Sequence, residues 1–218
     1  MRERNAQRIK TNKIVAIIRV KAAFDILPLT EALLKGGIDI IEVTMNTVNA
    51  LGCIEKMVKY FSADQLLTGA GTILSEKDAE QAINCGAKFI VTPATPGGII
   101  STAHHLGTVV LAGAYTPLEI LNAYSEGAEI IKIFPAEIMG IPYLKALKGP
   151  FSHIDFMPTG GITIENTLQW LNAGACALGI GSSLVNEELV KQKNWDAITS
   201  NAKQFRDAVD QFNANADK

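Results

Sequence analysis

Short apolar runs alternate with longer helical patterns along almost the whole chain, and this alternation constrains the fold more than any other feature of the sequence. Continuous runs rich in Ile and Val are typical of strands buried on both faces. The predicted strands span residues 14–20, 38–44, 66–72, 89–93, 109–114, 129–135, 154–158 and 177–181. The predicted helices span residues 24–35, 50–61, 76–84, 98–106, 117–125, 143–147, 164–173 and 195–212, and a polar helix at residues 2–11 precedes them all.

Strand and helix that alternate without interruption indicate parallel βα units. Eight such units close most simply into a TIM (β/α)8 barrel, and the N-terminal helix then caps one end of it. A doubly wound open sheet is the alternative. The Gly-Ala-Gly-Thr segment at residues 69–72 lacks the third glycine of a dinucleotide-binding fingerprint. No linker or change in composition divides the chain, so residues 1–218 are predicted to form a single barrel domain.

The composition argues against several classes of partner. The chain has 218 residues and a net charge of −2, which provides no basic surface for nucleic acid or an anionic membrane. No apolar run approaches the roughly 20 residues that cross a bilayer. Cysteine and histidine are few and lack the spacing of a zinc site; they are Cys53, Cys85, Cys176, His104, His105 and His153. The three cysteines are predicted to be buried free thiols, and we expect a soluble cytoplasmic protein.

A lysine interrupts the sixth predicted strand, Glu129-Ile-Ile-Lys-Ile-Phe-Pro135. Side chains alternate along a strand, so Ile130, Lys132 and Phe134 share one face. Lysine is almost never fully buried unless it is paired, and burial favours its neutral form. A neutral amine is a nucleophile that condenses with a ketone to give a Schiff base. The alternative is that Lys132 extends to water, or to a structural carboxylate, at the end of the strand.

A glutamate occupies the second predicted strand in a similar way. Ile41 and Val43 suit the helix-covered side of that strand, which leaves Glu42 facing the barrel interior. Strands two and six lie opposite each other in an eight-stranded barrel, so Glu42 and Lys132 are expected to approach near its axis. A carboxylate there can move protons during Schiff-base chemistry. The alternative is a buried ion pair, whose net contribution to stability is often near zero or unfavourable.

Two glycine-rich loops follow the seventh and eighth predicted strands, Pro-Thr-Gly-Gly-Ile at residues 158–162 and Gly-Ile-Gly-Ser-Ser at residues 179–183. Loops in these two places often bind phosphate in TIM barrels, and glycine lets backbone N–H groups approach the oxygens. The alternative is that the glycines only permit tight turns between strand and helix.

The chain resembles the KDPG and KHG aldolases, which act on 2-keto-3-deoxy-6-phosphogluconate and 4-hydroxy-2-oxoglutarate. The resemblance runs in order from about residue 12 to residue 190. Four segments carry it: Ile-Glu-Val-Thr at 41–44, Gly-Ala-Gly-Thr at 69–72, Lys-Ile-Phe-Pro-Ala-Glu at 132–137 and Pro-Thr-Gly-Gly-Ile at 158–162.

This resemblance implies a class I aldolase, a homotrimeric barrel without metal or other cofactor, that releases pyruvate from a keto acid, often a phosphorylated one. It assigns the Schiff base to Lys132 and the acid/base role to Glu42. It places Thr72, Pro93 and Phe134 around pyruvate. The residues implied to hold the phosphate are Thr159, Gly160, Gly161, Gly181 and Ser182.

The chain departs from the family pattern at two places. Asn46 stands where many members have an arginine that binds the pyruvate carboxylate, and an amide brings no charge to that contact. Arg19 is a candidate substitute. Thr92-Pro93-Ala94 stands where Ser-Pro-Gly is common.

Two other functions fit parts of the pattern. The first is a phosphosugar isomerase or epimerase, with Glu42 as base and Lys132 as its electrostatic partner. The second is a non-catalytic binding barrel that has lost activity through the change at Asn46. Neither alternative predicts a covalent adduct between pyruvate and Lys132.

Overall fold

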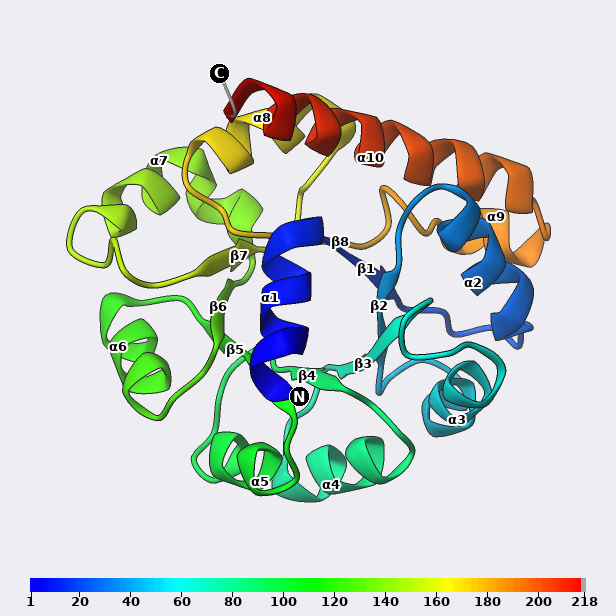
Figure 1. Cartoon of the computed structure of the whole chain (residues 1–218), viewed down its shortest axis with the longest axis horizontal. Coiled ribbons are helices and arrows are strands. Elements are labelled where there is room, and N and C mark those ends of the chain that lie inside the picture. Colours follow the sequence, from blue (N-terminus) through cyan, green and yellow to red (C-terminus); the bar gives the residue numbers. More distant parts are fainter. Residues whose placement is uncertain (217–218) are drawn as a thin grey trace.

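Eight parallel strands alternate with helices and wind into a barrel in the computed structural model, which describes residues 1–216 (Figure 1). The strands are β1 (Ile14–Ile18), β2 (Ile40–Thr44), β3 (Leu67–Gly71), β4 (Phe89–Val91), β5 (Val109–Ala114), β6 (Ile130–Ile133), β7 (Phe156–Pro158) and β8 (Leu178–Ile180). The helices are α1 (Arg2–Asn12), α2 (Ile26–Lys35), α3 (Ala50–Tyr60), α4 (Glu76–Asn84), α5 (Ile99–His105), α6 (Pro117–Ser125), α7 (Ala136–Lys148), α8 (Ile164–Asn172), α9 (Glu187–Lys191) and α10 (Trp195–Ala216). The predicted TIM barrel is confirmed, and the open-sheet alternative is wrong; residues 217 and 218 of the expected 1–218 domain lie outside the described residues.

Ladders of hydrogen bonds join the strands in the order β7-β6-β5-β4-β3-β2-β1-β8. Two isolated bridges, Phe156 to Ala175 and Thr159 to Gly179, bring β7 and β8 together and complete the ring. In this ring β2 and β6 are four strands apart, which places them on opposite sides of the barrel.

The alternation of side chains along each strand divides the core into two parts. On β2, Ile40 belongs to the cluster inside the barrel, while Ile41 and Val43 belong to the larger cluster between barrel and helices. All five residues of β2 are buried, including Glu42. A strand buried on both faces has few polar residues, so each polar side chain that it carries requires an explanation.

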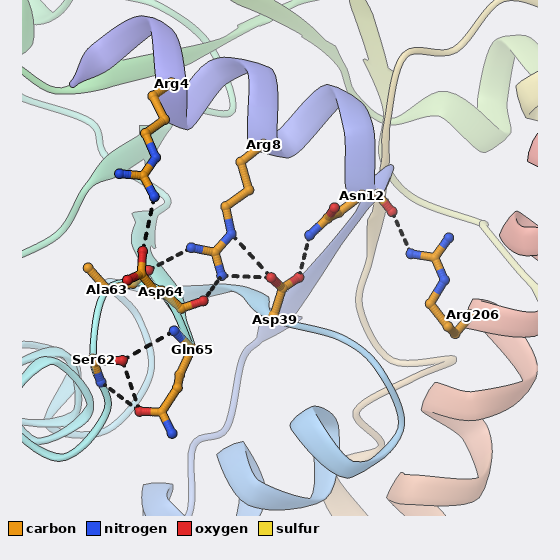
Figure 2. Close-up of polar contacts among 9 residues, drawn as sticks. All are labelled: Arg4, Arg8, Asn12, Asp39, Ser62, Ala63, Asp64, Gln65 and Arg206. Carbon is orange, nitrogen blue, oxygen red and sulfur yellow. Dashed lines mark hydrogen bonds and ion pairs between the residues drawn. The ribbon is translucent and has the colours of Figure 1, made fainter.

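Helix α1 closes the amino-terminal end of the barrel, and Figure 1 shows it lying across the ring. Its Ala6 and Ile9 pack into the cluster inside the barrel. Polar contacts fix its outer side (Figure 2): Arg8 pairs with Asp39 at 2.6 Å, and Asn12 donates to the same carboxylate at 2.7 Å. The N-terminal helix is therefore the predicted cap, and it leaves the opposite end of the barrel open.

Two helical segments differ from the sequence-based prediction. We expected only a short helix at residues 143–147 after β6, but α7 begins at Ala136. It is interrupted at Gly140, where φ is 70°, and continues through Pro142. Glycine and proline therefore mark a kink here and not a long loop. Helix α9 was not predicted at all. Among residues 1–216, no helix is long and apolar enough to span a membrane. The three cysteines are free, as predicted, but only Cys53 is buried, and Cys85 and Cys176 are partly exposed.

Candidate active site

Lys132 and Glu42 both point into the barrel from opposite strands. Lys132 is 3% exposed and Glu42 is fully buried. The orientation follows from alternation, because Ile130 packs inside the barrel while Ile131 and Ile133 pack outside it. The predicted inward direction of both side chains is confirmed.

A cavity of about 530 Å³ opens at the carboxyl ends of the strands. Lys132 and Phe134 line it from β6 and its extension, and Arg19 lines it from the end of β1. Its other wall is formed by the loops after β7 and β8. In TIM barrels this end carries the active site.

The ammonium or amine of Lys132 lies in surroundings that disfavour its charge. Burial lowers its pKa, and the nearby positive charge of Arg19 lowers it further, while Glu42 acts in the opposite direction. The Nζ atom lies over the Phe134 ring, 5.2 Å from its centroid. Lys132 therefore has an increased population of neutral amine.

Glu42 is shifted in the complementary direction. Burial raises its pKa, and the positive charges of Lys132 and Arg19 oppose that rise without cancelling it. Within the described chain, neither carboxylate oxygen of Glu42 has a hydrogen-bond partner, and Lys132 acts on Glu42 through the attraction of its charge alone. The two side chains are therefore not joined as a hydrogen-bonded ion pair. Paired groups whose environments favour the neutral forms are suited to nucleophilic and acid/base chemistry.

The raised pKa of Glu42 predicts a measurable effect on stability. Between the ordinary glutamate value, about 4.3, and the raised value, the native state holds a proton that the unfolded state releases. Stability therefore falls as pH rises through this window. The Glu42→Gln variant has no such group, so we expect its Tm to exceed that of the wild type increasingly as pH rises from acidic to neutral. The gain grows with the difference between the native and unfolded pKa values, and about 1 kcal/mol moves Tm by roughly 2–4 °C in a chain of this size. Parallel Tm curves across this pH range would contradict the prediction.

The loops after β7 and β8 leave their wall of the cavity lined by backbone and hydroxyl groups. Gly160 and Gly161 have φ values of 96° and 70°, a left-handed conformation that glycine adopts without strain. Thr159 is 5% exposed and its hydroxyl has no hydrogen-bond partner among the described residues. A Cβ at Gly181 would meet open space. These features suit an anionic ligand with several oxygens.

The cavity brings together most, but not all, of the predicted site residues. Eight of them line it: Arg19, Lys132, Phe134, Thr159, Gly160, Gly161, Gly181 and Ser182. Glu42 lies buried within the barrel and is not part of the lining. Asn46 is exposed and Thr72 half-buried, and neither borders the cavity. Pro93 borders a separate cavity of about 430 Å³ between the β4–α5 loop and α6.

Several lining residues were not predicted: Ile17, Glu137, Ile162, Thr163, Gly179, Ser183, Val185 and Glu187. Some had a usable signal, since Ile17 shares the inward face of β1 with Arg19, and Glu137 directly follows the strand-six segment. Glu187 had none, because it lies on the unpredicted helix α9. Within residues 1–216, no group of three or more His, Cys, Asp or Glu side chains is arranged to hold a metal ion.

Comparisons with known proteins agree with this site. The family model described as KDPG and KHG aldolase matches residues 6–201. A 2-dehydro-3-deoxy-phosphogluconate aldolase from Haemophilus influenzae is 34% identical and covers 88% of this chain and 90% of its own. A 2-dehydro-3-deoxy-6-phosphogalactonate aldolase from Escherichia coli is 32% identical over 90% of this chain and 96% of its own.

Among solved structures, the KDPG aldolase of Legionella pneumophila superposes with a TM-score of 0.84 at 30% identity, covering 91% of this chain and 96% of its own. That protein was captured with pyruvate as a covalent carbinolamine. Fold, motifs and relatives therefore agree, and the chain belongs to the KDPG and KHG aldolase family.

Proposed function

We propose that the chain is a class I aldolase that reversibly cleaves 2-keto-3-deoxy-6-phosphogluconate to pyruvate and glyceraldehyde 3-phosphate. The same chemistry on 4-hydroxy-2-oxoglutarate gives pyruvate and glyoxylate. The observation that carries the proposal is the buried Lys132 side chain on the lining of the 530 Å³ cavity, where burial also lowers its pKa.

Lys132 is proposed to attack the C2 ketone of the substrate through Nζ. Addition gives a carbinolamine, and loss of water gives a protonated Schiff base. The positive nitrogen then accepts the electron pair of the C3–C4 bond as that bond breaks. The C4 hydroxyl loses its proton, the fragment that contains C4 leaves as an aldehyde, and an enamine remains on Lys132. Protonation of the enamine at C3 and hydrolysis release pyruvate and restore the amine.

Glu42 is proposed to move the protons in these steps. It would donate a proton to the departing carbinolamine hydroxyl and accept the proton of the C4 hydroxyl during cleavage. A general acid/base works best when its pKa is near the operating pH, and burial shifts Glu42 in that direction. Because the carboxyl group has no fixed hydrogen-bond partner among the described residues, it is free to serve more than one atom.

Trapping with sodium borohydride tests the proposal directly. Reduction in the presence of pyruvate should leave one covalent pyruvate per chain, on the peptide that contains Lys132, and EDTA should not change the yield. Binding of phosphosugars without any adduct would favour the isomerase alternative instead. Thermal stabilisation by keto acids without adduct or turnover would favour the non-catalytic barrel.

The carboxylate and the phosphate of the substrate are proposed to bind at different parts of the cavity. Arg19 is the one arginine on the cavity lining of the described chain, and it is proposed to bind the pyruvate carboxylate, the role for which Asn46 is poorly placed. Thr159, Gly160, Gly161, Gly181 and Ser182 are proposed to bind the phosphate. Phe134 is proposed to pack against the pyruvate carbons, since Thr72 and Pro93 lie off this cavity.

Replacing Arg19 should weaken use of every keto acid. For Arg19→Gln we expect kcat/KM to fall about 10- to 100-fold, because a hydrogen bond between charged groups contributes roughly 1.5–3 kcal/mol. Asn46→Ala is the matched control and should change kcat/KM by less than about threefold. Steady-state kinetics with pyruvate release as the readout measures both variants. A large loss in Asn46→Ala with none in Arg19→Gln would assign the carboxylate contact to the amide.

A substrate panel would establish the aldehyde and the sugar configuration. The panel should contain phosphorylated and unphosphorylated 2-keto-3-deoxy acids of gluco and galacto configuration, together with 4-hydroxy-2-oxoglutarate. Comparison of the wild type with Asn46→Arg would show whether a second positive charge at the β2–α3 turn improves binding of any of them.

The chain is also proposed to form a homotrimer in the cytoplasm. The family resemblance supports the trimer, and so do large apolar side chains that stay exposed on α6 and at the start of α7: Leu118, Leu121, Tyr124, Ile138 and Met139. Light scattering after size exclusion tests the assembly, and cell fractionation tests the location.

A further inference from the structure

The carboxylate of Glu42 occupies the space that a side chain at position 71 would need. Gly71 is the last residue of β3 and is buried. A Cβ built on Gly71 would overlap Oε1 and Cδ of Glu42 and would lie 2.6 Å from its Cγ. These three atoms are the nearest to that Cβ, so Glu42 alone accounts for the closest overlaps.

The strand register shows in which direction Glu42 reaches. Glu42 pairs across β2 and β3 with Gly69, whereas Gly71 pairs with Thr44, two residues further along. The carboxyl group therefore extends along the strand toward the carboxyl end of the barrel, where the cavity opens. Because residue 71 is glycine and has no side chain, the Glu42 carboxyl group can occupy the space in that direction.

No hydrogen bond in the described chain holds the carboxyl group in this place. Neither of its oxygens has a hydrogen-bond partner, so only packing fixes its position. The Gly71 backbone, in contrast, is firmly held. Its carbonyl accepts from the Met45 amide at 2.7 Å, and β3 pairs with β2 on one side and β4 on the other.

We propose that Gly71 is a positioning residue, whose bare Cα directs the Glu42 carboxyl group toward Lys132. The inference rests on the proposed function, because it gives Gly71 a role only through the proton transfers of Glu42. Gly71 itself touches no reacting atom.

The variant Gly71→Ala tests this idea. The three atoms nearest to the added methyl all belong to the Glu42 side chain, so Glu42 is displaced, and thermal unfolding measured beside the kinetics shows whether the fold is kept. We expect kcat to fall about 10²- to 10⁴-fold, the range that positioned acid/base groups contribute. KM for the keto acid should stay within about threefold, because the proposed anion contacts lie on other strands.

A double-mutant cycle separates positioning from a general packing effect. Glu42→Ala removes the three atoms that the new methyl would meet, so Gly71→Ala should cause no further loss of kcat in that background. Gly69→Ala is a comparison variant on the same strand: Gly69 pairs with Glu42, but the three atoms nearest to its added methyl belong to the Phe89 ring and not to the carboxyl group. Its main effect should be a lower Tm, with a smaller loss of kcat than in Gly71→Ala.

The outcomes distinguish this inference from the proposed function. If Glu42→Ala is impaired and Gly71→Ala multiplies that loss by its full single-variant factor, Gly71 does not act through Glu42 and the inference fails. Unchanged kcat in Gly71→Ala alone would overturn it as well. If Glu42→Ala retains wild-type turnover, it is the acid/base assignment in the proposed function that fails.

Discussion

Lys132→Ala is expected to remove both the pyruvate adduct and turnover. No other lysine lines the cavity in the described chain, so no second amine is placed to form the Schiff base. We expect kcat to fall by at least roughly 10⁴-fold, the scale observed when a covalent nucleophile is removed. Mass spectrometry after borohydride reduction with pyruvate should find the adduct in the wild type and none in the variant.

The control for this experiment is a second lysine in similar packing. The Lys148 Nζ lies 5.5 Å from the centroid of the Phe156 ring, much as Lys132 lies over Phe134, but Lys148 is not on the cavity. Lys148→Ala should keep the adduct and turnover. Lys132→Met preserves most of the side-chain volume. It should also lose the adduct and turnover while it stays folded, which separates loss of the amine from misfolding. An adduct of normal yield in either Lys132 variant would exclude Lys132 as the nucleophile.

The barrel was predictable because its signal is repeated. Each strand is a short apolar run and each run is followed by a helical pattern, so an error in one element does not change the fold. The errors occur where local signals conflict. The predicted helix began only at residue 143, after Gly140 and Pro142, whereas the chain forms a kinked helix from Ala136 onward. Helix α9 has five residues, too few for a periodic pattern to appear.

The inward direction of Lys132 and Glu42 was predictable from alternation alone. The apolar residues on either side of each of them pack against the helices, so the residue between them faces the barrel interior. The distance between two such side chains was not, because it depends on strand tilt and on the space that neighbouring residues leave. The sequence therefore allowed a hydrogen-bonded ion pair, whereas in the structure the Glu42 oxygens have no hydrogen-bond partner among the described residues and Lys132 acts on them through its charge. Gly71 belongs to the Gly-Ala-Gly-Thr segment at residues 69–72, but nothing in that segment indicated that it leaves space for the Glu42 side chain.

Residues at strand ends were the hardest to place. Thr72 directly follows β3 and Pro93 is the second residue after β4, yet neither reaches the cavity that Arg19 and Lys132 share. At these positions the backbone leaves the strand, and alternation no longer determines the direction of a side chain. Thr72, for example, adopts a left-handed conformation with φ of 57°. The alternation of side chains along a strand therefore predicts which residues face the barrel interior, but not which residues beyond the strand ends face the cavity.

Glu42→Gln is expected to separate stability from catalysis. The amide cannot donate and accept the protons that the mechanism requires, so kcat should fall by about 10²- to 10⁴-fold. Its shape is nearly that of the carboxyl group, and the charge that burial penalises is gone, so the variant should be at least as stable as the wild type at neutral pH. Steady-state kinetics and thermal unfolding on the same preparation measure both effects.

Variants of Lys132 and Glu42 are expected to differ in how they form the covalent adduct with pyruvate. Because Glu42→Gln retains Lys132, borohydride should still trap pyruvate. Trapping should need longer incubation, because the variant lacks the acid that assists loss of water from the carbinolamine. Glu137→Gln is the matched control, because Glu137 also lines the cavity but lies on α7 and is exposed. It should keep the wild-type rate of trapping. Wild-type kcat and trapping rate in Glu42→Gln would show that another group, or water, moves the protons, even though Lys132 still forms the Schiff base.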